Sequence, residues 1–198
     1  MRRLACLVAG TRWQGLAEAT LARNFSTLEF LPVCSMKFNH LVEINDPLDP
    51  LTQALRREQV WRGLVLRAEA PMLFVPHLDA CDITRRTETV IDRSLRYGEV
   101  TIRDSVTFTP QEMVRYEVPA QNEIAASRLL MAIEEPADGS LKVRFSYEDD
   151  VTEAPGSIEA FYNEFRLSAY QASDIDTIRV IRELAGEGRL DLSPASPA

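Results

Sequence analysis

Six consecutive strand-like segments followed by one long helical segment constrain the fold of this 198-residue chain more than any other feature. Apolar and polar residues alternate within them, which is typical of strands with one buried face. The connections between them are short except for the loop 119–126, and the clearest hairpin turn is at residues 136–140, so the pattern favours an antiparallel meander. The six predicted strands are 81–86, 89–96, 99–108, 112–118, 127–135 and 141–149.

One more strand and two short helices are expected before the meander. Residues 36–45 alternate with a period of two and predict a half-buried strand. Asp49 precedes a proline and can cap a helix over 50–67 that bends or breaks near Glu58. Residues 71–74 predict a second, short helical turn. The chain is therefore expected to be an α+β protein with a seven-stranded antiparallel sheet.

The last predicted element is a helix from about Ser157 to Ala185, stopped by the glycines that follow it. At 1.5 Å per residue it spans about 40 Å, long enough to cover the sheet. Ala169 and Ala172 leave its middle thin, which favours a cavity between the helix and a curved sheet. The face expected to pack on the sheet comprises Ile158, Phe161, Phe165, Ala169, Ala172, Ile175, Ile178 and Ile181.

The two ends of the chain differ from its middle. Four arginines and two glutamates give residues 1–35 a net charge of +2, whereas the whole chain carries -8. We expect residues 1–35 to be a poorly ordered extension or a mis-assigned start, with Met36 as the working start. A weak amphipathic or transit-like helix is the alternative. The predicted domain is 36–188, and residues 189–198 are expected to be a disordered tail.

Composition excludes several classes of partner and site. The net charge of -8 is the wrong sign for binding nucleic acid through its phosphates. No apolar run approaches the roughly 20 residues that span a membrane. Three scattered cysteines and two histidines form no metal-binding or disulfide pattern. The sequence thus predicts a soluble, cytoplasmic protein without metal or cofactor, either a monomer or a weak homodimer.

Three segments carry a resemblance to a known family. They are MKFNHLVEIND at residues 36–46, VWRGLVLRAEAPMLFVP at 60–76 and MAIEEPADGSLKVRFSY at 131–147. The chain resembles the AtaL-like branch of the helix-grip superfamily, which includes START lipid-transfer domains, polyketide cyclases and birch-pollen-allergen-like proteins. The resemblance covers about residues 36–186 and implies a curved sheet wrapped around the last helix, with a hydrophobic pocket between them. It implies no catalytic residues.

Alternation along the strands assigns a set of side chains to the face under the helix. Asp104 lies between two apolar positions of that face, so it could be desolvated and serve as a general acid or base. The alternative is that Asp104 turns to solvent or pairs with Arg93 or Arg103. The full set is Phe38, His40, Val42, Val100, Ile102, Asp104, Val106, Phe108, Val114, Tyr116, Leu141, Val143, Phe145 and Tyr147.

His40 is the second candidate for chemistry. A neutral imidazole among apolar neighbours could donate to a ligand carbonyl or shuttle a proton, although a hydrogen-bonded core histidine is the alternative. Trp61 and Arg67 on the first helix are expected to be structural. The predicted ligand-binding set is His40, Val42, Ile102, Asp104, Tyr116, Phe145, Tyr147, Phe161 and Phe165.

Three functions remain open at this point. The leading prediction is a protein that binds an apolar or aromatic small molecule between the sheet and the last helix. The second is a cyclase-like or dehydratase-like enzyme that uses Asp104 with His40 or Tyr116. The third is an interaction protein whose cavity is filled, with an exposed apolar patch around Leu51 and Leu55.

Overall fold

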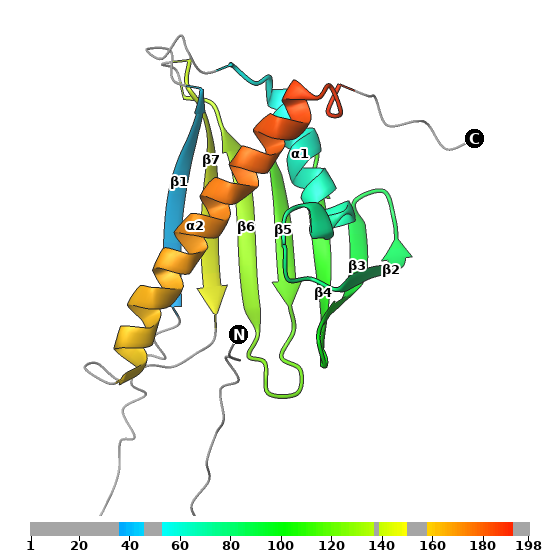
Figure 1. The fold of residues 1–198 in the computed structure, drawn as a ribbon, viewed down its shortest axis with the longest axis vertical. Helices are drawn as coiled ribbons and strands as arrows, with labels where there is room; N and C mark the ends of the chain where they lie inside the picture. Colours follow the sequence, from blue (N-terminus) through cyan, green and yellow to red (C-terminus); the bar gives the residue numbers. More distant parts are fainter. Residues whose placement is uncertain (1–35, 46–52, 137–138, 150–157, 192–198) are drawn as a thin grey trace, which may run out of the picture. The chain divides into compact units, whose positions relative to one another are not determined.

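Seven strands form one antiparallel sheet in which the first strand pairs with the last. They are β1 (Met36–Asn45), β2 (Ala80–Arg86), β3 (Val90–Tyr97), β4 (Val100–Thr109), β5 (Met113–Val118), β6 (Ser127–Glu134) and β7 (Leu141–Asp149). Their order across the sheet is β1-β7-β6-β5-β4-β3-β2 (Figure 1). This computed structural model describes residues 36–45, 53–136, 139–149 and 158–191, without the side chains of residues 36 and 158–164. The predicted seven-stranded antiparallel sheet is confirmed.

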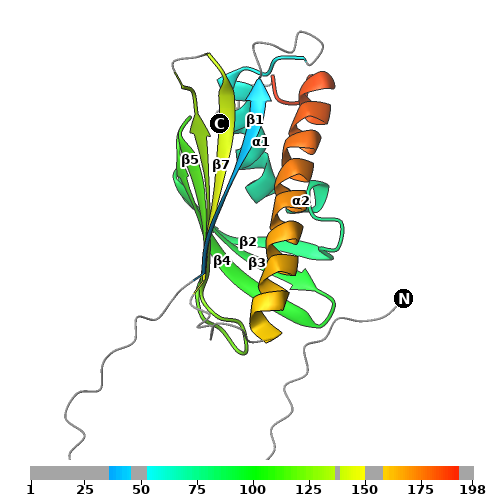
Figure 2. The ribbon, with the colours of Figure 1, turned by 90° about the vertical axis from the view of Figure 1, so that its left-hand side faces the viewer.

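Two helices and one helical turn lie on the same face of the sheet. They are α1 (Arg57–Glu69), the 3-10 turn η1 (Pro71–Leu73) and α2 (Ile158–Gly186). Figure 2 shows the sheet curving around α2, with α1 beside it. The predicted architecture of a curved sheet, two short helical segments and a long last helix is therefore confirmed.

A missing side chain lets α1 approach α2 closely. A Cβ atom on Gly63 would lie only 2.6 Å from Cγ1 of Ile181, closer than real carbon contacts allow. Ile181 itself is completely buried. Gly63 therefore holds α1 against the second half of α2, and α1 divides the space between α2 and the sheet.

The start of α1 corrects the sequence prediction. Residues 46–52, which include the expected cap Asp49 and Leu51, lie outside the described residues, and residues 53–56 are not helical. The side chain of Asn45 accepts a hydrogen bond from the Leu55 N–H at 2.9 Å and donates one to its carbonyl at 2.7 Å. Because both backbone groups of Leu55 are used, the helix begins only at Arg57, where Gln59 Oε1 accepts from the Arg56 N–H.

Leu55 is 4% exposed and belongs to the core, so it cannot form the exposed apolar patch that the interaction hypothesis placed there.

The end of the domain also differs from expectation. Leu190 is buried, and Asp191 accepts hydrogen bonds from Arg56 and Gln59 of the α1 region. The disordered tail was predicted to begin at residue 189, which is too early, because residues 189–191 pack on the domain.

The face that α2 turns to the sheet is also different from the predicted one. Phe165 is 71% exposed and Ile175 is 55% exposed, and Ala169 and Ala172 are exposed as well. Ile178 is buried as predicted. The inward positions are Tyr170, Asp174, Thr177, Ile178, Ile181, Leu184 and Ala185. Polar residues therefore replace apolar ones over the middle of the helix.

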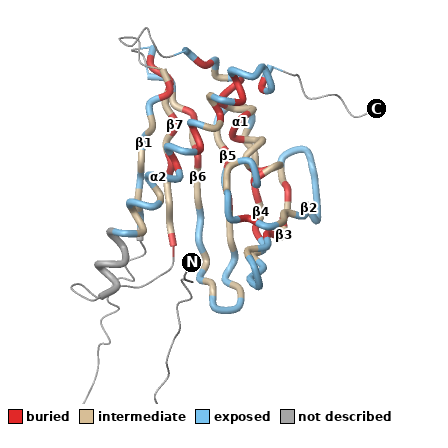
Figure 3. The backbone as a smooth tube through the Cα atoms, viewed as in Figure 1, coloured by how far each residue is buried: buried red, intermediate tan, exposed pale blue. Residues whose placement is uncertain are grey.

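The hydrophobic core occupies one end of the space between α2 and the sheet. It combines Val60 and Leu64 of α1 with Ile181 and Leu184 of α2 and with strand residues such as Phe145. Figure 3 shows buried stretches around α1 and the second half of α2, and further ones on β3, β4 and the end of β7. Around the middle of α2, the inward residues Tyr170, Asp174 and Thr177 are more polar. Within the described residues, no helix is both long and apolar enough to cross a membrane.

Candidate functional site

A cavity of about 350 Å³ lies where the core ends, between the sheet, η1 and the first half of α2. Arg67 from the end of α1, Tyr170 of α2 and the far ends of β3 to β7 surround it. Its size is within the roughly 300–1,000 Å³ of small-molecule sites. The lining residues are Arg67, Pro71, Val75, Arg93, Leu95, Tyr97, Asp104, Tyr116, Val118, Ser127, Arg128, Leu129, Tyr147, Glu148, Asp149 and Tyr170.

The structure brings three of the predicted ligand-binding residues to this cavity, namely Asp104, Tyr116 and Tyr147. His40 lies behind the wall, as described below. Val42 packs against the core, and Phe145 is completely buried within it. Ile102 is partly buried on β4, and neither it nor Val42 is among the lining residues.

The two phenylalanines of α2 do not add to the described cavity wall. Phe165 is exposed on the outer side of the helix, so the prediction that it lies between α2 and the sheet is wrong. The side chain of Phe161 lies outside the described side chains. Val100, also expected under the helix, is 50% exposed at the start of β4, beside the turn from β3.

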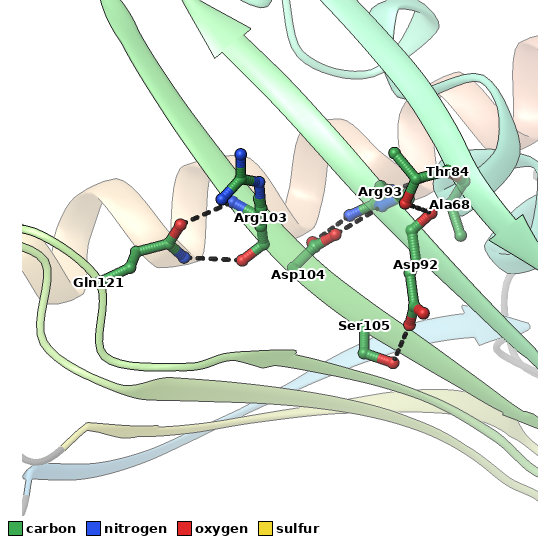
Figure 4. Close-up of polar contacts among 8 residues, drawn as sticks. All are labelled: Ala68, Thr84, Asp92, Arg93, Arg103, Asp104, Ser105 and Gln121. Carbon is green, nitrogen blue, oxygen red and sulfur yellow. Dashed lines mark hydrogen bonds and ion pairs between the residues drawn. The ribbon is translucent and has the colours of Figure 1, made fainter.

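Asp104 is held by Arg93 on the neighbouring strand. The two residues face each other across β3 and β4, and both guanidinium Nε and Nη2 of Arg93 donate to the carboxylate (Figure 4). Nη1 of Arg93 donates to the Ala68 carbonyl of α1 at 2.8 Å. The side chains are only 3% and 4% exposed. The structure thus shows the Asp104–Arg93 pair, which the sequence analysis gave as the alternative to an unpaired carboxyl at Asp104.

This buried pair also affects the charge of Arg93. Burial lowers the pKa of the guanidinium, but the hydrogen bonds and negative charge of Asp104 outweigh burial and raise it. Arg93 therefore remains charged and permanently paired. With both oxygens used by Arg93, Asp104 is poorly placed to move protons on a ligand.

Tyr116 lies beneath two arginines. The guanidinium carbons of Arg67 and Arg93 lie 5.3 Å and 5.0 Å from the centroid of its ring, within the range of cation–π attraction. The Tyr116 hydroxyl is buried and has no hydrogen-bond partner in the described part of the chain. A buried polar atom without a partner is unfavourable, so a bound molecule that reached this hydroxyl would gain a hydrogen bond.

Behind the cavity wall, Asp174 joins two of the predicted residues. Its Oδ1 accepts a hydrogen bond from the Tyr147 hydroxyl at 2.5 Å, and its Oδ2 lies 3.0 Å from Nδ1 of His40. Asp174 is 1% exposed. The three side chains form a chain of hydrogen bonds that ends at the Tyr147 hydroxyl in the cavity wall. His40 is therefore hydrogen-bonded, as the alternative interpretation expected, but its side chain is 19% exposed rather than part of the core, and it is linked to the site through Asp174.

Burial is the main cause of the shifted pKa values of Asp174 and Tyr147. It raises the pKa of Asp174, and the hydrogen bonds from Tyr147 and His40 and the charge of Arg67 only partly offset it. Burial, and then the negative charge of Asp174 and the hydrogen bond to it, raise the pKa of the Tyr147 hydroxyl far above its ordinary value. Tyr147 therefore keeps its proton and acts as a donor.

The Asp174→Asn variant is expected to change how stability depends on pH. Folded Asp174 has the higher pKa, so the native state binds more protons than the unfolded state above about pH 4. Its stabilising contribution is present at low pH and is lost as pH rises through the raised pKa. Urea unfolding between pH 4 and 8 should show that the unfolding free energy of the variant, relative to that of the wild type, rises with pH by at most about 1.4 kcal/mol per pH unit.

Asp176→Asn on the exposed side of the same helix is the control for this experiment. Among the described residues Asp176 pairs with Arg179, and both side chains are more than half exposed, so the difference in unfolding free energy between this variant and the wild type should not change with pH. A flat difference for Asp174→Asn as well would show that Asp174 is not desolvated.

Aromatic rings form one wall of the cavity. Tyr147 and Tyr170 stack with centroids 4.2 Å apart and an interplanar angle of 4°. Tyr97 completes this group at the end of β3, and burial raises the pKa of both Tyr97 and Tyr170. These hydroxyls remain protonated near neutral pH, so the wall can donate hydrogen bonds while offering flat apolar surface.

A larger hollow of about 610 Å³ lies on the opposite side of α1, but it does not contain this chemistry. Its aromatic floor pairs Trp61 with Phe108, edge to face, at 6.5 Å. The arginines at its rim are paired with acids of the same hollow: Arg56 with Asp191, and Arg62 and Arg86 with Glu69. We therefore place the site in the smaller cavity.

Sequence reasoning missed most of the cavity lining, including Arg67, Tyr97 and Tyr170, and it missed Asp174 behind the wall. Arg67 was expected to be structural. Tyr170 and Asp174 lie on α2 one position away from the apolar stripe that seemed to define its inner face. Their spacing of four residues, continued by Thr177 and Ile178, was the available signal. Among the described residues, no three His, Cys, Asp or Glu side chains are grouped to hold a metal ion.

Comparison with known proteins agrees with the fold. Residues 42–188 match the sequence model of a family described as AtaL, acetylaranotin biosynthesis cluster protein L. The Zhui aromatase/cyclase from Streptomyces sp. R1128 is similar in structure, with a TM-score of 0.54 and 14% identity over 83% of this chain and 100% of that one. No curated protein matches the sequence significantly.

Two further structures share the architecture. The di-domain ARO/CYC StfQ of the steffimycin pathway has a TM-score of 0.57 and 11% identity, over 80% of this chain and 53% of its own. Ara h 8.0201 has a TM-score of 0.51 and 10% identity, over 78% of this chain and 99% of its own. At such identities the likeness concerns the fold alone.

Proposed function

We propose that this chain, which belongs to the AtaL family, binds a small aromatic molecule in the cavity beneath the first half of α2. One observation carries the proposal: a cavity of about 350 Å³ remains open where the core ends, with stacked tyrosines in its wall. Planar rings favour stacking on such surfaces, and the tyrosine hydroxyls can orient a polar substituent.

Apolar side chains support the same choice of ligand. Leu95, Leu129, Pro71 and Val75 lie in the wall beside the tyrosines. Burial of a ring against them removes apolar surface from water, at about 25 cal/mol for each Å². The names of the structural neighbours, which include aromatase/cyclases, agree with an aromatic or polyketide-like ligand.

An enzyme of the cyclase or dehydratase type is the second candidate, and the hydrogen-bonded series Tyr147, Asp174 and His40 favours it. The Tyr147 hydroxyl donates its proton to Asp174, so its oxygen could accept a hydrogen bond from a ligand hydroxyl while Tyr147 passes its own proton to the buried carboxylate. In this version Tyr147 and His40 take the roles first considered for Asp104, whose oxygens are occupied by Arg93. The open cavity counts against the third hypothesis, an interaction protein with a filled interior.

The Leu129→Trp variant tests the proposed function. Leu129 lines the cavity, so an indole there should fill it and weaken binding of the neutral dye N-phenyl-1-naphthylamine at least about tenfold. Fluorescence titration measures the affinity. Leu130→Trp is the matched control, because the next residue of β6 points to the opposite face and should leave the affinity unchanged. A wild-type protein that does not bind the dye would contradict the proposal.

A further inference from the structure

The charges around the cavity balance except at one residue. Three acids of the lining have a basic partner: Asp104 pairs with Arg93, Glu148 with Arg128, and Asp149 with Arg166. Arg67 lines the same cavity and makes no ion pair with any described residue. Its charge does lower the pKa of Asp174, but only from beyond ion-pair distance. The cavity therefore presents a cation that no described carboxylate contacts within ion-pair distance.

Hydrogen bonds hold the guanidinium of Arg67 in place. Its Nε donates to Thr177 Oγ1 at 3.2 Å, and Thr177 in turn donates to the Ser173 carbonyl at 2.8 Å. The ring of Tyr116 supports the guanidinium from below. Within the described residues only Nε has a hydrogen-bond partner, so the two terminal nitrogens remain to bind a second group. A fixed pair of terminal N–H groups matches the two oxygens of a carboxylate.

A second unsatisfied group belongs to the same place. The Tyr116 hydroxyl, on the ring beneath Arg67, is buried without a hydrogen-bond partner in the described chain. It can donate to, or accept from, a polar substituent of a ligand. An unpaired cation and an unpaired hydroxyl next to stacked aromatic rings together specify one type of molecule.

We propose that the ligand is an aromatic acid, whose ring lies against Tyr147 and Tyr170 and whose carboxylate binds the terminal nitrogens of Arg67. This inference rests on the proposed function and adds the charge of the ligand to it. Arg67 thereby becomes the residue that selects anionic over neutral ring compounds. The aliphatic and aromatic parts of the wall would bind both kinds equally.

Competition with the neutral dye tests the inference with two matched probes, 2-naphthoate and 2-naphthamide. They have the same ring and nearly the same shape but differ in charge. Wild-type protein should bind the naphthoate roughly 10- to 100-fold more tightly, the range expected for charge-assisted hydrogen bonds. Arg67→Gln should bring this preference close to one, with the affinity for 2-naphthamide changed by no more than about threefold. Arg67→Lys should keep part of the preference.

Arg115→Gln is the matched control. Arg115 precedes Tyr116 on β5 and is exposed on the other face of the sheet, so its removal subtracts the same charge without touching the cavity. It should leave the preference at the wild-type value. Equal binding of the two probes to the wild type would overturn the inference and leave the proposed function standing. Failure to bind the dye and both probes would overturn the two together.

Discussion

The Asp104→Asn variant is expected to lose about 3–5 kcal/mol of its free energy of unfolding. The substitution keeps the shape of the side chain but removes the charge that compensates Arg93. Arg93 is 3% exposed and also bound to the Ala68 carbonyl, so it cannot swing into water. Urea unfolding followed by circular dichroism measures the loss, and 3–5 kcal/mol is a large part of the stability of an ordinary domain.

Two further variants test whether the loss of stability comes from the uncompensated buried charge of Arg93. Asp92→Asn removes the acid of a more exposed pair with Arg85 on the same sheet and should destabilise the protein far less than Asp104→Asn, because water screens this pair. The double variant Arg93→Met with Asp104→Leu removes both buried charges and should recover most of the loss, because neither charge is then left uncompensated. A cost below about 1 kcal/mol for Asp104→Asn would mean that solvent in the cavity hydrates Arg93.

The sheet could be predicted because alternation along a strand reports directly which side chains are buried. On β3, Ile91, Arg93 and Leu95 are buried, while Asp92 and Ser94 between them are only partly buried. Each short turn then limited the pairing to neighbouring strands. The pairing of β1 with β7, by contrast, follows from no local signal. It was not predicted from the sequence, and the structure shows it.

Alternation does not show what covers a buried position. Phe145 and Tyr147 have the same parity on β7 and both were predicted to touch the ligand. Phe145 lies at the end covered by α1 and joins the core, whereas Tyr147, two residues later, reaches the cavity. The position of α1 depends on Gly63 and on the Asn45 clamp around Leu55, which are tertiary contacts.

On α2, two stripes of residues compete at helical spacing. The apolar stripe of Phe165, Ala169, Ala172 and Ile175 was chosen because burial normally favours it. The structure buries the neighbouring stripe that contains Tyr170 and Asp174, since Tyr147, His40 and Arg67 satisfy its polar groups. A pattern that counts only hydrophobicity cannot weigh hydrogen bonds that partners elsewhere in the chain provide.

The Phe145→Ala variant is expected to lose about 3–5 kcal/mol of unfolding free energy, because it removes a ring from the packed core. Phe165→Ala is the matched control: the same substitution at a 71% exposed position of α2 should change stability by no more than about 0.5 kcal/mol. Both phenylalanines were predicted to contact the ligand, and chemical unfolding measures both effects. If Phe145→Ala instead folded as stably as the wild type and lost only dye binding, the cavity would extend to Phe145, and the boundary drawn by α1 between core and site would be wrong.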